Sequence, residues 1–381
     1  FKPSAIYKHK LLMSDTKTNI NIFKSHLTIK SDYVGGKAKP HSANGQKIHK
    51  LSSNENLLGS SPKALQAIQD CLHKLNEYPD QTDIRLREAL ADFYGTPMTA
   101  DHFFTGNSGS EILELIARAF LDPGLEAIIA SPTFMPYRLF SEKMGAKVID
   151  IPLLAPNFDL NVAEVLAAVN ERTRLLFLTS PNNPTGSYIP TETLEYILEA
   201  LPSHVVLVLD EVYFQFTDQG DYTTALPYAI KNKNIIGVNS FSKAYGLAGL
   251  RVGYAYTHPD FARYIRQLHR PFLVNALSLN AAIGALADSA FLQETVNLVQ
   301  SEREFLYEEL DQRPIQYWKS QGNFVLVKPP IPPKDFEARM LEQGVMVRPV
   351  ENFGAKGCVR ITIGTREANK AMLSALDRVL N

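Results

Sequence analysis

The segment VVLVLDEVYFQF at residues 205–216 largely decides how the chain is expected to fold. It opens with five apolar residues, three of them valines, and Asp210 follows directly. An uninterrupted apolar run of this kind is typical of a strand buried on both faces, as in a parallel sheet covered by helices. Because an ionised carboxylate is costly to bury alone, Asp210 is expected to meet a cation at the carboxyl end of this strand. That cation is either part of a ligand or a neighbouring Lys or Arg side chain.

Similar short apolar runs recur on both sides of this segment. They lie at 127–130, 147–151, 174–179, 235–238 and 252–256. Apolar residues at helical spacing predict helices at 61–75, 82–94 and 110–120. The alternation of helices with buried strands predicts an α/β fold, with a large, mostly parallel sheet and helices on both of its faces.

Beyond residue 275 the pattern changes. One long helix is predicted at 277–310, followed by strands at 323–327, 345–347 and 359–363 and by helices at 334–343 and 367–380. A chain of 381 residues is long enough for more than one domain. We therefore predict an N-terminal arm at 1–30, a large domain at 61–275, and a smaller α+β domain formed by 31–60 together with 276–381.

The composition is that of an ordinary globular protein, with 45% hydrophobic and 21% charged residues. Lys and Arg number 39 and Asp and Glu number 40, so no basic excess favours a nucleic-acid partner.

Cys71 and Cys358 are too few for a disulfide framework and lack metal-ligand spacing, so we expect reduced thiols and no metal site. No apolar stretch reaches the roughly 18 residues that span a membrane, and residues 1–30 lack a secretory apolar region. We expect a cytoplasmic protein without a membrane partner.

A second segment with chemical potential is NSFSKAYGLAGLRVGY at 239–254. Lys243 follows the apolar run at 235–238, Ser240 and Ser242 precede it, and Arg251 lies eight residues further on. Two hydroxyl groups and a guanidinium suit a phosphate dianion, and a lysine in such a site can act as an amine nucleophile. A single lysine is more often a solvated surface residue, but this one follows a predicted buried strand.

Two further loops place polar groups near predicted strand ends. TGNSGSE at 105–111 opens a helix, so the backbone N–H groups of Gly109 and Ser110 can bind an anion. The loop lacks the GK[ST] ending of a nucleotide-binding P-loop. SPNNPTG at 180–186 reads as a tight turn, yet its carboxamides, among them Asn183, could also hold a hydroxyl group of a ligand.

In this order, these segments resemble the fold type I aminotransferases that depend on pyridoxal 5′-phosphate (PLP), and above all the histidinol-phosphate aminotransferase group. The likeness covers about residues 31–381. It is carried by SSNENLLGSSP (52–62), EYPD (77–80), SPTF (131–134), SPNNPTG (180–186), LDEVYFQF (209–216), SFSKAYGLAGLRVGY (240–254) and CVRITIGTREAN (358–369). The resemblance implies the aspartate aminotransferase-like fold and a transaminase that passes an amino group from a small-molecule donor to 2-oxoglutarate.

The resemblance also implies the contacts of the cofactor. Lys243 forms a Schiff base with PLP, and Asp210 pairs with the protonated pyridine nitrogen. The other implied contacts are Asn183 and Tyr213 at the ring hydroxyl, Phe134 stacked on the ring, and Gly109, Ser110, Ser240, Ser242 and Arg251 at the phosphate. Tyr78 reaches the phosphate of a neighbouring subunit, so a homodimer is expected. Without the resemblance, Phe134 reads equally as a core residue.

Three residues are implied in substrate binding. Arg360 clamps a carboxylate, while Arg348 and Tyr33 bind the phosphate of histidinol phosphate; the alternative for Arg348 is a surface salt bridge. Leu57 stands where the group has proline, and Leu273 where it has a polar residue. These departures leave open an aromatic amino acid transaminase or a PLP-dependent decarboxylase of a phosphorylated amino acid. A regulator with a degenerate aminotransferase domain is disfavoured by the intact Lys243.

Overall fold

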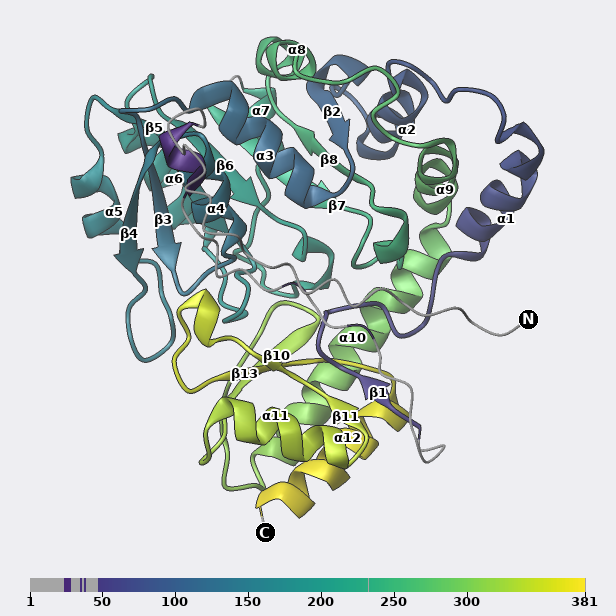
Figure 1. The fold of residues 1–381 in the computed structure, drawn as a ribbon, viewed down its shortest axis with the longest axis vertical. Coiled ribbons are helices and arrows are strands. Elements are labelled where there is room, and N and C mark those ends of the chain that lie inside the picture. Colours follow the sequence, from purple (N-terminus) through teal and green to yellow (C-terminus); the bar gives the residue numbers. More distant parts are fainter. Residues whose placement is uncertain (1–23, 29–34, 36–37, 39–46, 232, 381) are drawn as a thin grey trace, which may run out of the picture.

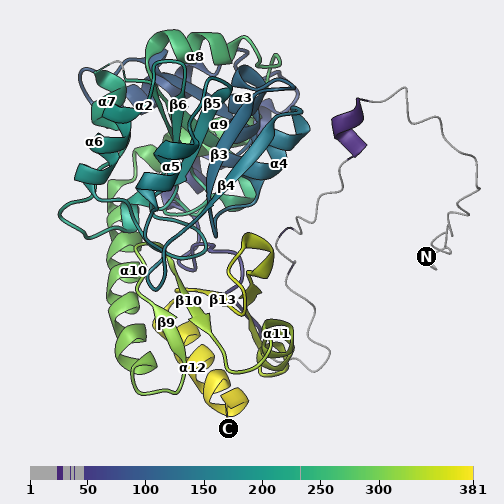
Figure 2. The same cartoon turned by 90° about the vertical axis from the view of Figure 1, so that its left-hand side faces the viewer.

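The computed structural model describes residues 24–28, 35, 38, 47–231 and 233–380. A large sheet with helices forms the upper part of Figure 1, and smaller sheets with helices form the lower part. The long helix α10 (Ser289–Leu310) leads from the upper part along one side of the lower part (Figures 1 and 2). No helix of the described ranges is long and apolar enough to cross a membrane.

The large sheet has seven strands in the order β2-β8-β7-β6-β5-β3-β4. Strand β8 pairs antiparallel with both of its neighbours, and all other neighbouring pairs are parallel. The strands are β2 (Phe103–Gly106), β3 (Glu126–Ser131), β4 (Lys147–Pro152), β5 (Thr173–Thr179), β6 (Val206–Asp210), β7 (Ile235–Ser240) and β8 (Gly253–Tyr256). The predicted α/β fold with a mostly parallel sheet is confirmed, although β2 was not predicted.

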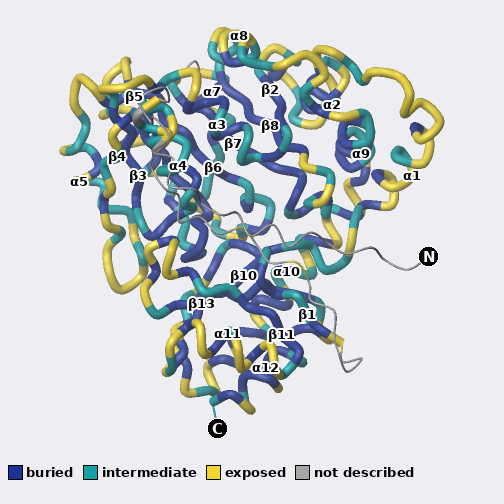
Figure 3. Tube along the Cα trace, in the orientation of Figure 1, coloured by how far each residue is buried: buried dark blue, intermediate teal, exposed yellow. Residues whose placement is uncertain are grey.

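Successive side chains of each central strand enter two different cores. In β3, Ala127 and Ile129 pack with one cluster, whereas Ile128 and Ala130 pack with another on the opposite face. The first cluster is covered by α3 (Gly109–Phe120), α4 (Pro136–Lys143) and α8 (Pro259–Arg266). The second is covered by α1 (Pro62–Cys71), α2 (Ile84–Tyr94), α5 (Val162–Ala168), α6 (Thr191–Ala200), α7 (Leu226–Ile230) and α9 (Ala276–Leu286). Burial on both faces, visible as dark blue strands in Figure 3, explains the uninterrupted apolar runs.

The prediction of one helix at 277–310 is wrong, because the chain forms two helices, α9 and α10, that meet at Asp288. The Asp288 side chain caps the first turn of α10. Its Oδ2 also accepts a hydrogen bond of 2.7 Å from Ser61, the residue that caps α1. Capping therefore breaks the helix and joins the start of α10 to the start of α1. Helix α9 packs against α1 and α2.

The lower part holds a four-stranded antiparallel sheet, β12-β13-β10-β9, and the parallel pair β1-β11. Its elements are β1 (His49–Lys50), β9 (Gln316–Trp318), β10 (Phe324–Lys328), α11 (Pro333–Glu342), β11 (Val345–Met346), β12 (Arg348–Pro349), β13 (Val359–Thr362) and α12 (Arg366–Leu380). The β1-β11 pair joins the segment before residue 60 to the C-terminal part. The domain boundaries at 60 and 275 stay a prediction, and most of the predicted arm at 1–30 lies outside the described residues.

Candidate active site

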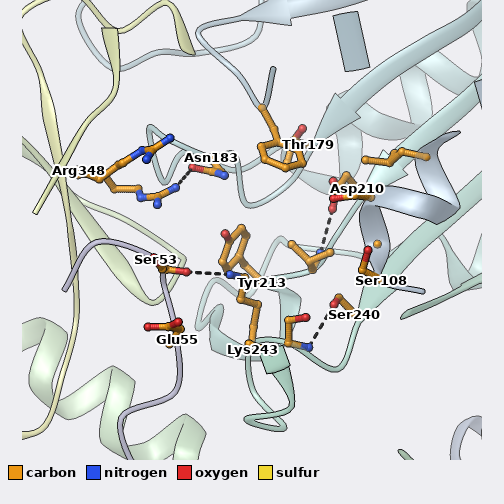
Figure 4. Close-up of a pocket in the computed structure, with 18 of the residues that line it drawn as sticks. Ser53, Glu55, Ser108, Thr179, Asn183, Asp210, Tyr213, Ser240, Lys243 and Arg348 are labelled. Atoms are coloured by element: carbon orange, nitrogen blue, oxygen red, sulfur yellow. Dashed lines mark hydrogen bonds between the residues drawn. The ribbon is translucent and has the colours of Figure 1, made fainter. Parts of the chain in front are cut away.

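A cavity of about 470 Å³ lies at the carboxyl ends of three neighbouring strands, between the large sheet and the lower part (Figure 4). Thr179 ends β5, Asp210 ends β6 and Ser240 ends β7, and all three line the cavity. The predicted site residues in its wall are Gly109, Ser110, Phe134, Asn183, Asp210, Tyr213, Ser240, Ser242, Lys243, Arg251, Arg348 and Arg360. The fold thus brings together residues that are 251 positions apart in the chain (Gly109 to Arg360).

Asp210 is buried at the floor of the cavity. Its Oδ2 accepts a hydrogen bond of 2.6 Å from the hydroxyl of Tyr137, and its Oδ1 accepts one of 3.3 Å from the backbone N–H of Val212. Burial raises the pKa of Asp210 to about 6, against these hydrogen bonds and the charge of Lys243, which lower it. A carboxylate held in this way is suited to pair with a cationic group of a ligand.

Lys243 projects into the same cavity from the turn after β7. Its Nζ donates to the backbone oxygen of Ser53 at 3.2 Å and lies 5.7 Å from the centre of the Tyr213 ring. Burial, together with the charge of Arg360, lowers the pKa of Lys243 to about 7. A lysine with this pKa is partly neutral near pH 7, which a nucleophilic amine requires.

The start of α3 forms one side of an anion cradle. Ser108 makes no side-chain cap of this helix, and the Gly109 and Ser110 positions line the cavity, so the first turn faces it with the positive end of the helix dipole. Ser240, Ser242 and Arg251 line the same cavity, and their hydroxyl and guanidinium groups are suited to bind an anion there.

The backbone geometry around these residues is consistent with an anion site. Ser108 has a φ of 97° and Arg251 a φ of 52°, left-handed values that cost energy in non-glycine residues and cluster at functional sites. Gly253 permits the close approach of β8, because a Cβ there would lie 2.6 Å from the backbone N of Gly109. The strained backbone of Ser108 and Arg251 and the close approach of Gly253 to Gly109 therefore lie beside the proposed anion site.

Above the floor, Asn183 and Arg360 contact each other. Arg360 donates through Nη1 to Oδ1 of Asn183 and through Nη2 to the backbone oxygen of Ser52, the latter at 3.1 Å. Because a guanidinium only donates, Asn183 must turn its oxygen toward Arg360, so its Nδ2 is the group left to donate to a ligand. The Tyr213 hydroxyl accepts a hydrogen bond of 3.0 Å from Asn54.

The cavity also has an aromatic wall and a second arginine. The Phe134 ring packs edge-on against Tyr137 and Phe353, with centroid distances of 5.7 and 6.1 Å. Arg348 donates to the backbone oxygen of Gly35 at 2.9 Å and lies 5.9 Å from the centre of the Phe353 ring. In Figure 4, Arg348 and Asn183 lie on the side of the cavity opposite Asp210.

Two predicted site residues are not brought to this cavity. Tyr33 lies outside the described residues. Tyr78 lines a different hollow beside α1 and α9, is 82% exposed, and stacks on Phe272 with a centroid distance of 4.6 Å. The contribution of Tyr78 to the site of a neighbouring subunit stays a prediction.

Sequence reasoning missed other parts of the wall, including Tyr137, Thr179, and the ion pair of Lys50 with Glu55 at 2.6 Å. Thr179 ends an apolar run, as Asp210 does, so the same rule could have found it. Tyr137 follows Phe134 by three residues in SPTFMPY and lies in the first turn of α4, and its spacing in the sequence does not mark it as a cavity residue. Among the described residues, no group of His, Cys, Asp and Glu side chains is arranged to hold a metal ion.

The cavity combines a partly neutral lysine, a buried carboxylate opposite it and an anion cradle. Residues 46–376 match the family described as aminotransferase class I and II. The chain belongs to this family.

Histidinol-phosphate aminotransferase 2 of Carboxydothermus hydrogenoformans is 41% identical over 334 residues, or 87% of this chain and 91% of that protein. The enzyme of the same name from Pseudomonas fluorescens is 38% identical over 355 residues, or 92% of this chain and 95% of that protein.

Solved structures agree with this assignment. Histidinol-phosphate aminotransferase of Sinorhizobium meliloti, in complex with PLP, superposes with a TM-score of 0.79 at 26% identity, covering 88% of this chain and 92% of that one. Aspartate aminotransferase of Thermus thermophilus with maleate gives a TM-score of 0.78 at 26% identity, covering 88% and 93%. The aspartate aminotransferase-like fold is confirmed, and the protein is a PLP-dependent aminotransferase.

The residues present fit PLP. The cradle of Gly109, Ser110 and the two serines with Arg251 suits its phosphate, the amine of Lys243 suits its aldehyde, and Asp210 suits its ring nitrogen. Burying a carboxylate is costly, and the raised pKa of Asp210 reflects that cost.

Proposed function

We propose that this aminotransferase moves the amino group of histidinol phosphate to 2-oxoglutarate, with Lys243 as the amine that binds PLP. The choice of donor rests on two guanidinium groups, those of Arg348 and Arg360. Both line the cavity and are separate from the residues proposed to bind the PLP phosphate. A donor phosphate and an acceptor carboxylate each require such a group. The names of the relatives support the same donor. On this proposal the protein acts in histidine biosynthesis in the cytoplasm.

The proposed roles at the centre follow from the two titratable groups. When bound, PLP supplies the electron sink for charge that develops at the donor's Cα. Asp210 keeps the ring nitrogen protonated and so maintains that sink. Lys243 would hold PLP through its amine and, when that amine is free, would take the proton from the donor's Cα and return it, because a partly neutral amine is suited to both steps.

The remaining residues bind and orient. Asn183 and Tyr213 hold the ring hydroxyl, and Phe134 stacks on the ring. Gly109, Ser110, Ser240, Ser242 and Arg251 hold the phosphate of PLP. Arg360 clamps the carboxylate of 2-oxoglutarate, and Arg348, together with Tyr33, binds the phosphate of histidinol phosphate.

The two departures from the group's pattern that left an aromatic donor open do not line the described cavity. Leu57 packs against the core of the lower part, and Leu273 packs against both cores of the large sheet. Neither residue is in the described cavity wall. We therefore keep histidinol phosphate as the proposed donor.

Arg348→Ala is expected to lower kcat/KM for histidinol phosphate by about tenfold to hundredfold, because a charge-assisted contact of about 1.5–3 kcal/mol is lost. Activity with phenylalanine should change little, since that donor has no phosphate. The bound PLP spectrum should stay unchanged. Steady-state kinetics with both donors and 2-oxoglutarate, with carbon dioxide release measured in parallel, give the answer.

The matched control is Arg339→Ala, which removes an exposed arginine of α11. It should affect neither donor. An equal loss for both donors in Arg348→Ala, or a wild type that prefers phenylalanine, would favour the aromatic transaminase instead. Carbon dioxide release without amino transfer would favour the decarboxylase.

We also propose a homodimer in which Tyr78 contributes to the PLP phosphate site of the partner. Tyr78→Phe should weaken PLP binding by about tenfold, the cost of a hydrogen bond to a charged group. Tyr264→Phe, which alters a tyrosine 66% exposed on α8, is the control and should have no effect. Sedimentation with PLP titration tests the assembly itself: a monomer that is saturated with PLP and active contradicts the proposal.

A further inference from the structure

The contact between Tyr137 and Asp210 has no part in the roles proposed above. Tyr137 is 1% exposed, lines the cavity, and donates to Oδ2 of Asp210 at 2.6 Å. The backbone N–H of Val212 holds Oδ1 at 3.3 Å. Both oxygens of the carboxylate are therefore anchored from the protein side, which fixes its plane and directs its remaining lone pairs toward the cavity.

The direction of the Tyr137 hydrogen bond is set by its surroundings. Burial raises the pKa of Tyr137 far above its usual range, so the hydroxyl keeps its proton. Thr179 Oγ1 donates to the Tyr137 oxygen at 2.8 Å, which commits that oxygen as an acceptor and its proton to Asp210. Thr133, beside Thr179, has its own acceptor in Oδ1 of Asn182 at 3.0 Å. The hydrogen bonds thus converge on the carboxylate as donors.

We propose that Tyr137 is a positioning residue that keeps Asp210 ionised and oriented toward the ring nitrogen of PLP. This role rests on the proposed pairing of Asp210 with that nitrogen. Burial acts in the opposite direction and raises the pKa of Asp210 to about 6; of the influences that lower this pKa, the Tyr137 hydrogen bond is the largest. Without Tyr137, Asp210 would be protonated over more of the neutral range and free to rotate.

Other titratable groups act on Asp210 from neighbouring elements. Lys243 lowers its pKa, and the charges of Glu211 and Tyr222 interact with it. None of the three is among the described hydrogen-bond donors to its carboxylate. Tyr137 is thus the one neighbouring side chain in the described structure that both donates to this carboxylate and fixes its orientation.

Tyr137→Phe removes the donor and keeps the ring, which stacks on Phe177 with a centroid distance of 5.3 Å. The variant should fold, bind PLP about tenfold more weakly, and shift the pKa of the bound PLP chromophore upward. The upward sign follows because a less protonated ring nitrogen withdraws fewer electrons from the chromophore. Absorbance titrations with PLP and with pH measure both quantities without catalysis.

The control is Tyr307→Phe, which removes a buried hydroxyl that bonds to both backbone groups of Ser320 at 3.1 and 2.6 Å, away from the cavity. It should shift neither quantity. If Tyr307→Phe shifts the PLP affinity and the chromophore pKa in the same way, the shifts reflect a general loosening of the protein's packing, and the inference is overturned.

A PLP analogue with carbon in place of the ring nitrogen separates this inference from the proposed role of Asp210. The wild type should bind the analogue more weakly than PLP, and Tyr137→Phe should then cost no further affinity. If Tyr137→Phe weakens the analogue as much as it weakens PLP, Tyr137 does not act through the ring nitrogen and the inference fails. If the wild type binds the analogue as tightly as PLP, the pairing of Asp210 with the nitrogen is itself wrong.

Discussion

Replacing Lys243 with alanine is expected to lower kcat for transamination by on the order of 10⁴-fold. The variant loses both the amine that binds PLP and the group that moves the proton at Cα. Lys243 is suited to both roles because burial lowers its pKa to about 7 and its Nζ lies in the cavity that Asp210 also lines. Single-turnover assays with histidinol phosphate measure the effect, and circular dichroism checks that the fold is retained.

Lys334→Ala, which changes an exposed lysine of α11, should turn over at the wild-type rate. A small free amine added to Lys243→Ala should recover part of the lost rate, because it supplies the missing proton carrier. Turnover of Lys243→Ala within about tenfold of the wild type would be incompatible with the proposed proton transfer.

Asp210→Ala is expected to lower kcat by about a hundredfold to several-thousandfold. Breaking a buried charge pair costs about 3–5 kcal/mol, and each 1.36 kcal/mol in the barrier is about a factor of ten. The variant leaves the ring nitrogen without its carboxylate and the hydroxyl of Tyr137 without its acceptor. Pre-steady-state kinetics should show the loss in the step at Cα more than in PLP binding.

The adjacent residue provides the matched control for Asp210. Glu211 is also buried, but its carboxylate accepts from Tyr256, Asn239 and the backbone N–H of Ala225, and it is not in the described cavity wall. Glu211→Gln keeps the volume and should change kcat by less than about tenfold. Near-normal turnover in Asp210→Ala, or an equal loss in Glu211→Gln, would contradict the assigned role.

Much of the large sheet was predictable, because strands buried on both faces leave uninterrupted apolar runs. The strand at 235–238, for example, was predicted within two residues of β7 (Ile235–Ser240). Strand β2 was not predicted because its sequence, FFTG, has only two apolar residues in a row and so leaves no apolar run. The break between α9 and α10 was not predicted, because apolar residues recur at helical spacing on both sides of it. Asp288, directly before Ser289, is nevertheless a residue type that caps helices and could have indicated the break.

The site residues that could be predicted are the reactive side chains at the ends of buried strands. Asp210 and Lys243 follow buried runs, and the carboxyl ends of parallel strands meet at one edge of the sheet. Tyr137 was not predictable, because its contact with Asp210 depends on how α4 docks against the sheet, which spacing does not reveal. Tyr78 could be linked to the site only through the family resemblance, since within one chain it stacks on Phe272.

Reduction of the PLP-loaded protein with sodium borohydride, followed by mass mapping of its peptides, tests the central assignment most directly. We expect one pyridoxyl group, on Lys243 in the peptide SFSKAYGLAGLR. Lys50 also lines the cavity and is the internal comparison. A label on Lys50 or another lysine, or PLP that binds without becoming fixed to Lys243, would show that Lys243 is not the amine that binds PLP.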